Sequence, residues 1–495
     1  MRSWQFPLAL SSDPHLPLFL RIADSVVRDI QRGRLRPGDR LPGSRRLAAS
    51  LGVHRNTVLA AYDELHAEGW VTAVRGRGTF VARMPPDNAL ERATKAPLSR
   101  IPEQVGFHLD APIASSHLPR LPRSLVLRCD GTADPRLIPV AMLSRAYRRV
   151  LRLQGRTVLN YTRDAQGLPR LRVALASLLA ATRGIAAPAD AILVARGTQM
   201  GVSLIARTLI APGEVVAVED PGYPPAWDAL RMAGSRLVPV PVDDGGLRVD
   251  ALADIAAHTR IRAVYVTPHR QFPTTVTLGQ ERRQALLEMA QAARIAVIED
   301  DYDSEFHYEG SPIAPLASAD RAGVVIYVSS LSKVLAPGLR LGYVIGPPEF
   351  IRAVAAYRTC LDFQGDQPLE AAVAELLEEG EIQRHVRRVR RLYMVRRDAM
   401  AEALRAELGG AVSFNTPSGG MALWTRVAPG IDVDLWWRRA VDRRVSFVAG
   451  WRFAFERRTA SGCARIGFAQ FNEREIRDAV QRLARALPRA SDSGR

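Results

Sequence analysis

The feature that most constrains the fold is a repeated alternation of short apolar runs and amphipathic stretches, which begins near residue 125. Each run is rich in β-branched residues and is followed by polar or glycine residues, as in AILVARG, EVVAVEDPG, IRAVYVTPH, RIAVIEDDYD and GVVIYVSSLSK. Strands that alternate with helices in this way form a parallel sheet whose site lies at the carboxyl ends of the strands. We therefore predict an α/β domain over residues 125–488, with a smaller α+β lobe from about residue 380.

The chain is long enough for more than one domain, because 495 residues exceed the size at which a single hydrophobic core stops growing. Residues 1–82 hold short helical patterns and end in a glycine-rich hairpin signal. Residues 83–124 carry many prolines and little periodicity, which is typical of a linker. We predict an N-terminal domain over the first segment, a linker over the second, and a disordered tail over residues 489–495.

The N-terminal segment contains the pattern of a helix-turn-helix. Residues 18–33 have apolar residues at helical spacing and end at Gly33. SRRLAASL follows as a short helix, with Ser44 as the expected N-cap and Gly52 at its end. HRNTVLAAYDELHAEG gives the next helix after a tight turn, and VTAVRGRGTFVA predicts two strands that form a wing. The first turn of the second helix is where a recognition helix meets base edges and phosphates.

This segment resembles the winged helix-turn-helix of GntR-type bacterial regulators, through PGDRLPGSRRLA, LGVHRNTV, AYDELHAEGWV and RGRGTFVA. The resemblance implies that double-stranded operator DNA is a partner. The positions that match the DNA-contacting residues of the family are Arg45, His54, Arg55, Asn56, Thr57, Arg75 and Gly76. His54 stands where the family more often has Ser or Thr, which affects base preference and leaves the docking mode unchanged. A solvated basic face on a small helical module is the alternative interpretation.

The formal net charge of +17 points to nucleic acid or another polyanion. An arginine-biased composition is the alternative explanation, because the only lysines are Lys95 and Lys333. In such a composition a remaining lysine is informative. Schiff-base chemistry needs a primary amine that can lose its proton, and arginine cannot supply one. A lysine at a strand end is therefore a candidate for this chemistry.

Residue types with useful chemistry gather where the apolar runs of the larger domain end. RGTQMG places Gly197 and Thr198 at a helix start, where backbone N–H groups and the helix dipole favour a phosphate. EDPGYPPAW exposes Tyr223 on a proline-flanked loop, where its ring could stack on a planar group. AVIEDDYDSEFHY delivers Asp300 and Tyr302 to a strand end, where a carboxylate can hold a protonated ring nitrogen. Taken alone, the first two segments also fit an ordinary helix cap and an ordinary turn.

The run YVSSLSKVLAPGLRLGYVIG places Lys333 after a strand, with Ser330 and Ser332 beside it and Arg340 seven residues later. A lysine, a hydroxyl and an arginine so placed favour a Schiff base and a phosphate clamp. Together, the four segments resemble fold-type I pyridoxal 5′-phosphate (PLP) enzymes, the aspartate-aminotransferase-like group. The resemblance extends over nearly all of residues 125–488.

The resemblance to these enzymes implies a role for each residue. Lys333 forms the Schiff base with PLP, Asp300 pairs with the pyridine nitrogen, Tyr302 pairs with the ring hydroxyl, and Tyr223 stacks on the ring. The residues expected to hold the phosphate are Gly197, Thr198, Gln199, Ser330 and Arg340.

Two further positions follow from the same resemblance. Arg465, in CARIGFAQF, stands where this fold keeps its arginine for a substrate α-carboxylate, which a guanidinium fork binds bidentately. One surface arginine among many is the alternative. The Asn-Pro-x-Gly turn of aminotransferases reads HRQFPTT here, and Gln271 is the expected polar partner near the ring.

A winged helix-turn-helix, a long linker and an aminotransferase-like domain, in that order, resemble the MocR/GabR regulators over almost the whole chain. The resemblance implies a homodimer whose larger domain senses a small amine, an amino-acid-like effector or PLP itself. Exchange at the Schiff base of Lys333 would then change DNA affinity. GABA-responsive members carry an arginine two residues after the stacking tyrosine. Pro225 stands at that position here, which argues against GABA as the effector.

Two functions stay open: a DNA-binding transcription regulator, and an active PLP-dependent aminotransferase that carries a DNA-binding module. The architecture favours the regulator, with at most weak transaminase activity. No metal site is expected, because Cys129, Cys360 and Cys463 lack metal-ligand spacing. The sequence has neither an apolar run long enough to span a membrane nor a basic-then-apolar leader. We therefore expect no membrane partner and a cytoplasmic location.

Overall fold

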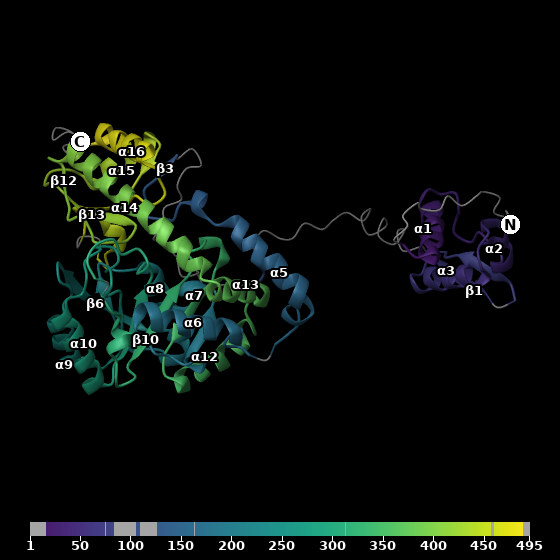
Figure 1. Ribbon diagram of the computed structural model, residues 1–495, viewed down its shortest axis with the longest axis horizontal. Coiled ribbons are helices and arrows are strands. Elements are labelled where there is room, and N and C mark those ends of the chain that lie inside the picture. The colour runs from purple at the N-terminus through teal and green to yellow at the C-terminus, as the bar shows by residue number, and fades with distance from the viewer. Residues whose placement is uncertain are drawn as a thin grey trace. The chain divides into compact units, whose positions relative to one another are not determined.

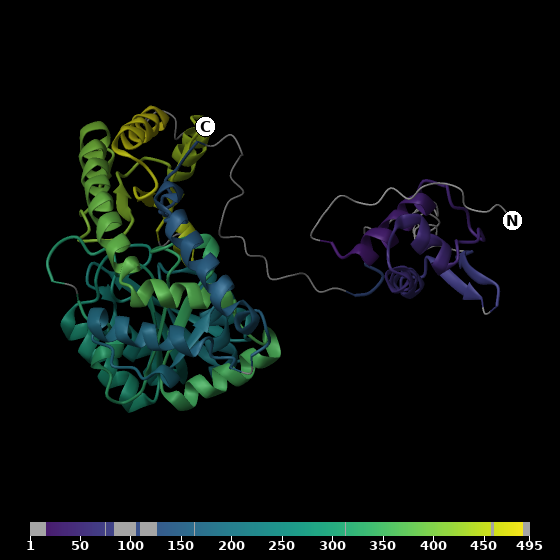
Figure 2. The same ribbon diagram turned by 45° about the vertical axis from the view of Figure 1, so that its right-hand side comes forward.

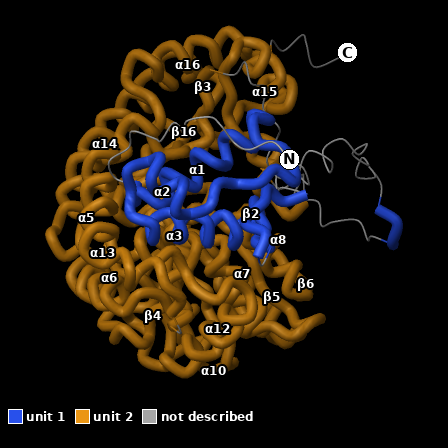
Figure 3. Tube along the Cα trace, turned by 90° about the vertical axis from the view of Figure 1, so that its right-hand side faces the viewer, with its two compact units in different colours: residues 1–110 blue, residues 111–495 orange. Residues whose placement is uncertain are grey.

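The computed structural model (Figure 1) describes residues 16–74, 76–83, 105–108, 126–162, 164–311, 313–456 and 460–488. The chain forms two compact units, residues 1–110 and residues 111–495 (Figures 2 and 3). Each unit has its own hydrophobic core. Most of the expected linker, residues 83–124, and the whole expected tail, residues 489–495, lie outside the described residues.

Three helices and a two-stranded hairpin form the smaller unit. Their bounds are α1 Leu18–Gln31, α2 Ser44–Leu51, α3 Arg55–Ala67, β1 Val71–Val74 and β2 Gly78–Val81. The two strands pair antiparallel. Ile22 and Val26 of α1 and Val58 and Leu65 of α3 are fully buried in one cluster. This is the winged helix-turn-helix predicted from the sequence.

The turn between α2 and α3 depends on Gly52, whose φ of 65° is a left-handed conformation that a residue without a Cβ adopts at little cost. The prediction that Ser44 is the N-cap of α2 is wrong. Gly43 holds that position, and Ser44 is the first helical residue. The Ser44 hydroxyl instead accepts a hydrogen bond from Arg55 Nε at 3.3 Å, which ties the start of α2 to the start of α3.

An eight-stranded sheet forms the centre of the larger unit, in the order β4-β11-β10-β9-β8-β5-β6-β7. The bounds are β4 Ile192–Ala195, β5 Val215–Asp220, β6 Arg236–Asp243, β7 Gly246–Leu247, β8 Ile261–Val266, β9 Ala296–Asp301, β10 Val325–Ser330 and β11 Gly342–Ile345. The strands from β10 to β6 in that order run parallel, whereas β11 and β7 are antiparallel to their neighbours. The five apolar runs quoted from the sequence are all strands of this sheet.

Alternate residues of a strand point to opposite faces of the sheet. Both faces carry buried apolar residues, and helices cover both. On one face, Leu193 and Val328 pack with α7, α8 and α12. On the other face, Val194 and Tyr327 pack with α5, α6 and α13, and further along the sheet Val264 packs with α9 and α10. The bounds are α5 Val140–Val158, α6 Pro169–Arg183, α7 Gly197–Leu209, α8 Pro224–Met232, α9 Val249–His258, α10 Gln280–Ala293, α12 Pro348–Leu361 and α13 Gln367–Glu378.

The C-terminal part forms the smaller α+β lobe around a second sheet, in the order β12-β13-β16-β15. The bounds are α14 Glu381–Leu408, β12 Val412–Ser413, β13 Ala422–Val427, α15 Val433–Asp442, β14 Val445–Ser446, β15 Val448–Ala449, β16 Cys463–Gly467 and α16 Glu473–Ala486. Strand β3, Leu127–Arg128, pairs in parallel with β14, so the segment that opens the larger unit belongs to this lobe. In the part of the chain that the structure describes, no helix combines the length and apolarity needed to cross a membrane.

Candidate functional site

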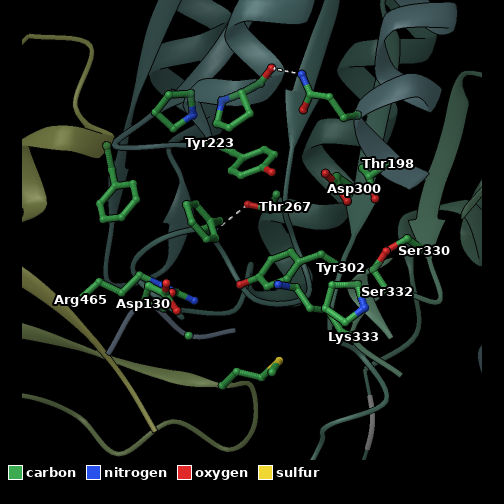
Figure 4. A pocket seen from close by; sticks show the side chains of 18 of the residues that line it. Asp130, Thr198, Tyr223, Thr267, Asp300, Tyr302, Ser330, Ser332, Lys333 and Arg465 are labelled. Atoms are coloured by element: carbon green, nitrogen blue, oxygen red, sulfur yellow. Dashed lines mark hydrogen bonds between the residues drawn. The ribbon is translucent and has the colours of Figure 1, made fainter. Parts of the chain in front are cut away.

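A cavity of about 320 Å³ lies in the larger unit, where β5, β8, β9 and β10 end (Figure 4). Its wall brings together residues that are far apart in the sequence. The predicted site residues that line it are Thr198, Gln199, Tyr223, Asp300, Tyr302, Ser330, Lys333, Arg340 and Arg465. Strand ends and helix starts therefore gather nearly all of these side chains around one space, as expected for an α/β sheet.

Asp300 lies at the end of β9 with one carboxylate oxygen unused. Its Oδ2 accepts a hydrogen bond from the Tyr265 hydroxyl at 2.6 Å. Its Oδ1 is buried and has no hydrogen-bond partner among the described residues. Burial raises the pKa of Asp300 to about 7, and Asp301 and Asp303 act in the same direction. A cation brought to Oδ1 would satisfy this oxygen and favour the ionised carboxylate.

Lys333 follows β10 after a short turn and lies in the cavity wall (Figure 4). Burial lowers the pKa of Lys333, and the Arg465 cation acts in the same direction. A lowered pKa increases the fraction of neutral amine, which is the nucleophilic form. The neighbouring Ser332 hydroxyl is buried and has no hydrogen-bond partner in the described part of the chain.

A narrow cradle lies where α7 begins. Gly197 is the first residue of α7 and has a φ of 79°. A Cβ at Gly197 would lie 2.9 Å from Arg340 Nη2, so only a glycine lets this guanidinium approach so closely. Arg340 Nη2 also donates to the carbonyl oxygen of Arg196 at 3.1 Å. The first N–H groups of a helix, a guanidinium and the Ser330 hydroxyl form a donor set that suits a phosphate.

Arg465 comes from β16 and is only 5% exposed. Its Nη1 donates to the carbonyl oxygen of Asp130 at 2.8 Å, while its Nε is buried without a described hydrogen-bond partner. The guanidinium carbon lies 4.8 Å from the centre of the Phe272 ring. Burial lowers the pKa of Arg465, and the Tyr302 side chain acts in the opposite direction. A desolvated cation with unused donors suits a ligand carboxylate.

An aromatic cluster closes one side of the cavity around Phe272. The Phe272 ring lies edge-on to Tyr223 at 5.0 Å, to Phe453 at 5.3 Å and to Tyr302 at 5.7 Å between ring centres. Edge-to-face pairs at these distances are favourable and hold the rings in fixed orientations. Sequence reasoning missed Phe272, although it stands in HRQFPTT, where aminotransferases have the asparagine of their turn.

Gln271, the expected polar partner, is not among the residues that line the cavity. Its side-chain amide donates to the carbonyl oxygen of Pro221 at 2.8 Å and to Glu219 Oε2 at 3.2 Å. Thr267 lines the cavity instead. Its hydroxyl donates to Glu219 Oε2 at 2.6 Å and accepts from the Phe272 N–H at 2.9 Å. Gln271 and Thr267 therefore fix the turn that carries Phe272.

In the smaller unit, most of the residues predicted to contact DNA lie near the start of α3. His54 is the N-cap of α3, and its Nδ1 accepts from the Asn56 N–H at 3.3 Å. Arg45 and Arg55 are exposed, and Thr57 is half-buried. Gly76 is exposed in the turn of the wing with a φ of 76°, whereas Arg75 lies outside the described residues.

Two family models match the chain. The model for bacterial regulatory proteins of the gntR family matches residues 18–81, and the model for aminotransferase class I and II matches residues 132–483. The fold and the cavity therefore define a class of protein: a helix-turn-helix regulator joined to an aminotransferase-like domain.

Curated relatives narrow the class to one family. The chain is 30% identical over 508 aligned residues to the probable rhizopine catabolism regulatory protein MocR of Rhizobium meliloti, which covers 98% of this chain and 97% of MocR. It is 34% identical to the HTH-type transcriptional regulator TauR of Rhodobacter capsulatus, over 94% of this chain and 96% of TauR. The chain belongs to the MocR/GabR-like family of transcriptional regulators.

Solved structures resemble the larger unit. The α-aminoadipate aminotransferase LysN of Thermus thermophilus, complexed with N-(5′-phosphopyridoxyl)-L-leucine, matches with a TM-score of 0.68 at 30% identity. The match covers 74% of this chain and 92% of LysN. The fold class predicted from the sequence, a winged helix-turn-helix followed by a fold-type I aminotransferase-like domain, is confirmed.

Proposed function

We propose that this chain is a transcription regulator that binds double-stranded operator DNA through residues 1–82, and PLP with an amine-bearing effector through residues 125–488. One observation carries the proposal. The free Asp300 oxygen, the Lys333 amine and the Arg465 guanidinium all belong to the wall of one cavity. These three groups suit, in turn, a ring cation, an aldehyde and a carboxylate. PLP, when bound, supplies an aldehyde that primary amines attack.

Each residue would contribute by binding or positioning. Asp300 would pair with the ring nitrogen and keep it protonated, and Tyr302 would pair with the ring hydroxyl. Tyr223 would lie against the ring, and Lys333 would attach to the aldehyde carbon. The phosphate would be held by Gly197, Thr198, Gln199, Ser330 and Arg340. The close approach of Arg340 to Gly197 and the unpartnered Asp300 oxygen support this assignment.

The effector would be an amino-acid-like amine held by Arg465. Its carboxylate would take the unused Nε donor and compete with the Asp130 carbonyl oxygen for the guanidinium. Its amine would then face Lys333 across the cavity. We further propose that the protein is a cytoplasmic homodimer, as its family resemblance implies, and that Arg45, His54, Arg55, Asn56, Thr57, Arg75 and Gly76 contact the operator.

An active aminotransferase is the alternative, and one observation favours it. Asp300, Lys333 and Arg465 all line the cavity, and LysN, a named aminotransferase, matches the larger unit at 30% identity. With a second keto acid supplied to take up the amino group, release of keto acid from amino acids in stoichiometric excess over the protein would support this alternative. A single turnover or none would favour the regulator.

The test compares Arg465→Ala with Arg426→Ala, a matched control on the adjacent strand β13 whose side chain is 63% exposed. Operator DNA selected from a random library is titrated with apo protein, PLP-loaded protein, and PLP-loaded protein plus a panel of amino acids and amines. Loss of a charge-assisted fork from a desolvated site should weaken effector binding by about 2–4 kcal/mol. We expect Arg465→Ala to keep PLP and DNA binding and lose the effector response.

The competing result is a DNA affinity that depends on PLP alone. If PLP shifts the affinity, no amine shifts it further and Arg465→Ala responds like the wild type, then amine sensing is wrong. The Arg426→Ala control should behave like the wild type in every arm.

A further inference from the structure

Four arginines form one exposed stripe along the first half of α14, and none of them belongs to the cavity. The α14 arginine stripe consists of Arg384, Arg387, Arg388 and Arg391. Residues three, four and seven positions apart share a helix face, so the four guanidinium groups project from one side. The opposite side of the helix is buried through Val389 and Tyr393. Figures 2 and 3 show α14 at the edge of the larger unit.

The charge of the stripe is not compensated within the described part of the unit. Among the described residues, none of the four arginines has an ion-pair or side-chain hydrogen-bond partner. Three other arginines of the same helix are partnered: Arg396 and Arg397 donate to backbone carbonyl oxygens, and Arg405 donates to a threonine hydroxyl.

The acidic side chains that precede the stripe in the chain have partners elsewhere. Glu381 pairs with Arg145 of α5 at 2.6 Å, and Glu378 pairs with Arg170 of α6 at 2.5 Å. Glu379 is likewise paired, with an arginine of α5. These carboxylates therefore pair with arginines of α5 and α6, and none of them forms an ion pair with an arginine of the stripe.

The spacing of the stripe has a cost for the helix. Arg384 with Arg388, and Arg387 with Arg391, are like charges four residues apart, and each such pair destabilises an isolated helix. An external anion would relieve this repulsion. Guanidinium groups present a planar fork that matches phosphate oxygens, so phosphate is the anion that the stripe fits best.

We propose that the α14 arginine stripe binds the sugar-phosphate backbone of the same DNA duplex that the helix-turn-helix recognises, an inference that rests on the proposed function. Seven residues of helix span about 10 Å, and a duplex of that length carries about six phosphate charges. The contact adds affinity without reading sequence. The chain between Arg83 and Val126 is about 40 residues long, which could span up to about 140 Å if extended.

The test uses the full-length protein and random-sequence duplex DNA, so no operator need be known. A triple variant, R384Q/R388Q/R391Q, removes three charges from the stripe. The matched control, R474Q/R477Q/R485Q, removes three exposed arginines of α16 in the same lobe. A third protein, R384K/R388K/R391K, keeps the charge. Affinity is measured by fluorescence anisotropy over a series of salt concentrations, and thermal unfolding confirms that each variant folds.

Each phosphate contact contributes about −0.9 to the slope of log affinity against log salt. We expect the glutamine variant to have a slope shallower by about 2–3, while the lysine variant and the α16 control stay near the wild-type slope. On a selected operator, the glutamine variant should keep the wild-type ratio of specific to random affinity.

Two results would overturn the proposal while leaving the proposed function intact. An unchanged slope in the glutamine variant would show that the stripe is solvated in the complex. An equal loss of slope in the α16 control would show that overall charge acts in place of contact. Failure of the wild-type protein to bind any duplex would overturn the proposed function together with this inference.

Discussion

Two buried carboxyl groups near the cavity have the same raised pKa for the same reason, but they differ in their hydrogen bonds and in their position. Burial raises the pKa of both Asp300 and Glu219 to about 7. Glu219 Oε2 accepts hydrogen bonds from the Thr267 N–H, the Thr267 hydroxyl and the Gln271 side-chain amide, so this one oxygen holds a turn in place. Asp300 accepts from Tyr265 alone and keeps one oxygen free at the cavity. Asp300 lines the cavity and Glu219 does not, so position at the cavity wall, and not pKa, distinguishes the two carboxyl groups.

Asp300→Asn should change how the stability of the PLP-free protein depends on pH. The pKa of Asp300 is raised from 3.8 to about 7 in the folded protein, so its contribution to stability is fully present below about pH 4 and is lost as the pH rises to 7. Asparagine does not titrate. We expect the free energy of unfolding of the variant, relative to that of the wild type, to rise by up to about 4 kcal/mol between pH 4 and pH 8.

Urea unfolding of both PLP-free proteins at intervals from pH 4 to pH 8 measures this difference. Parallel stability curves would mean that Asp300 does not carry the titration.

The same substitution should weaken PLP binding about ten- to a hundredfold, because a charge-assisted hydrogen bond contributes about 1.5–3 kcal/mol.

Lys333→Ala should abolish covalent attachment of PLP. In the wild type, borohydride treatment of PLP-loaded protein should leave a stable pyridoxyl label on a primary amine. Lys95 is the only other lysine and serves as the control, since Lys95→Ala should label normally. Mass spectrometry of the reduced proteins gives the result. A label that persists in Lys333→Ala would move the attachment point away from this residue.

At the scale of elements, the sequence predicts the strands that are apolar on both faces and misses those that break the pattern. Runs such as IRAVYV are buried along their length and are typical of central parallel strands. β6 was not predicted, because Pro239 and Pro241 interrupt it. It tolerates both because β7 pairs only with its last two residues, so their missing N–H groups lie along an edge without a strand partner.

The same distinction holds for the candidate site. Residues such as Asp300 and Lys333 follow strands directly, so the rule that sites form at strand ends gathers them from sequence alone. Phe272 sits on a turn whose shape depends on Glu219, and Asp130 meets Arg465 across 335 residues of sequence. Contacts of this kind come from tertiary packing, which no local pattern encodes.

Helix α3, the second helix of the helix-turn-helix, carries a prediction of its own. Arg55→Ala should weaken operator binding by about 1–3 kcal/mol if Arg55 reads a base edge. If it touches only phosphate, the loss should be equal on scrambled DNA and the salt slope should fall. Gel-shift titration at two salt concentrations on both DNAs separates these cases.

Ser44→Ala is the control for that experiment, because it removes only the hydroxyl that accepts from Arg55 Nε. It should leave operator affinity within a few tenths of a kcal/mol. If Arg55→Ala loses no affinity on either DNA, Arg55 does not belong to the interface.

At the scale of the whole molecule, the two units have separate cores and should unfold separately. The core of the smaller unit contains only residues of α1 to β2 and their connections, and the proposed PLP residues lie entirely in the larger unit. PLP at a hundred times its dissociation constant should stabilise the larger unit by about 2.7 kcal/mol. Differential scanning calorimetry should show one transition that rises in temperature and one that does not. In Lys333→Ala, PLP should raise the transition temperature of the larger unit by less than in the wild type. A shift of both transitions together would contradict independent unfolding of the two units.

The hydrogen bond between Arg465 and Asp130 links the proposed effector site to the segment where the described part of the larger unit begins. Cys129 and Asp130 closely follow Val126, where the described part of the larger unit begins. The Asp130 carbonyl oxygen holds the Arg465 guanidinium, and the Cys129 carbonyl oxygen accepts from the Gly467 N–H at 2.9 Å on the same strand. These two hydrogen bonds thus join strand β16, which carries Arg465, to the first described residues of the larger unit. A ligand carboxylate that bound Arg465 would compete with the Asp130 carbonyl oxygen and would weaken a contact that lies only four residues after Val126.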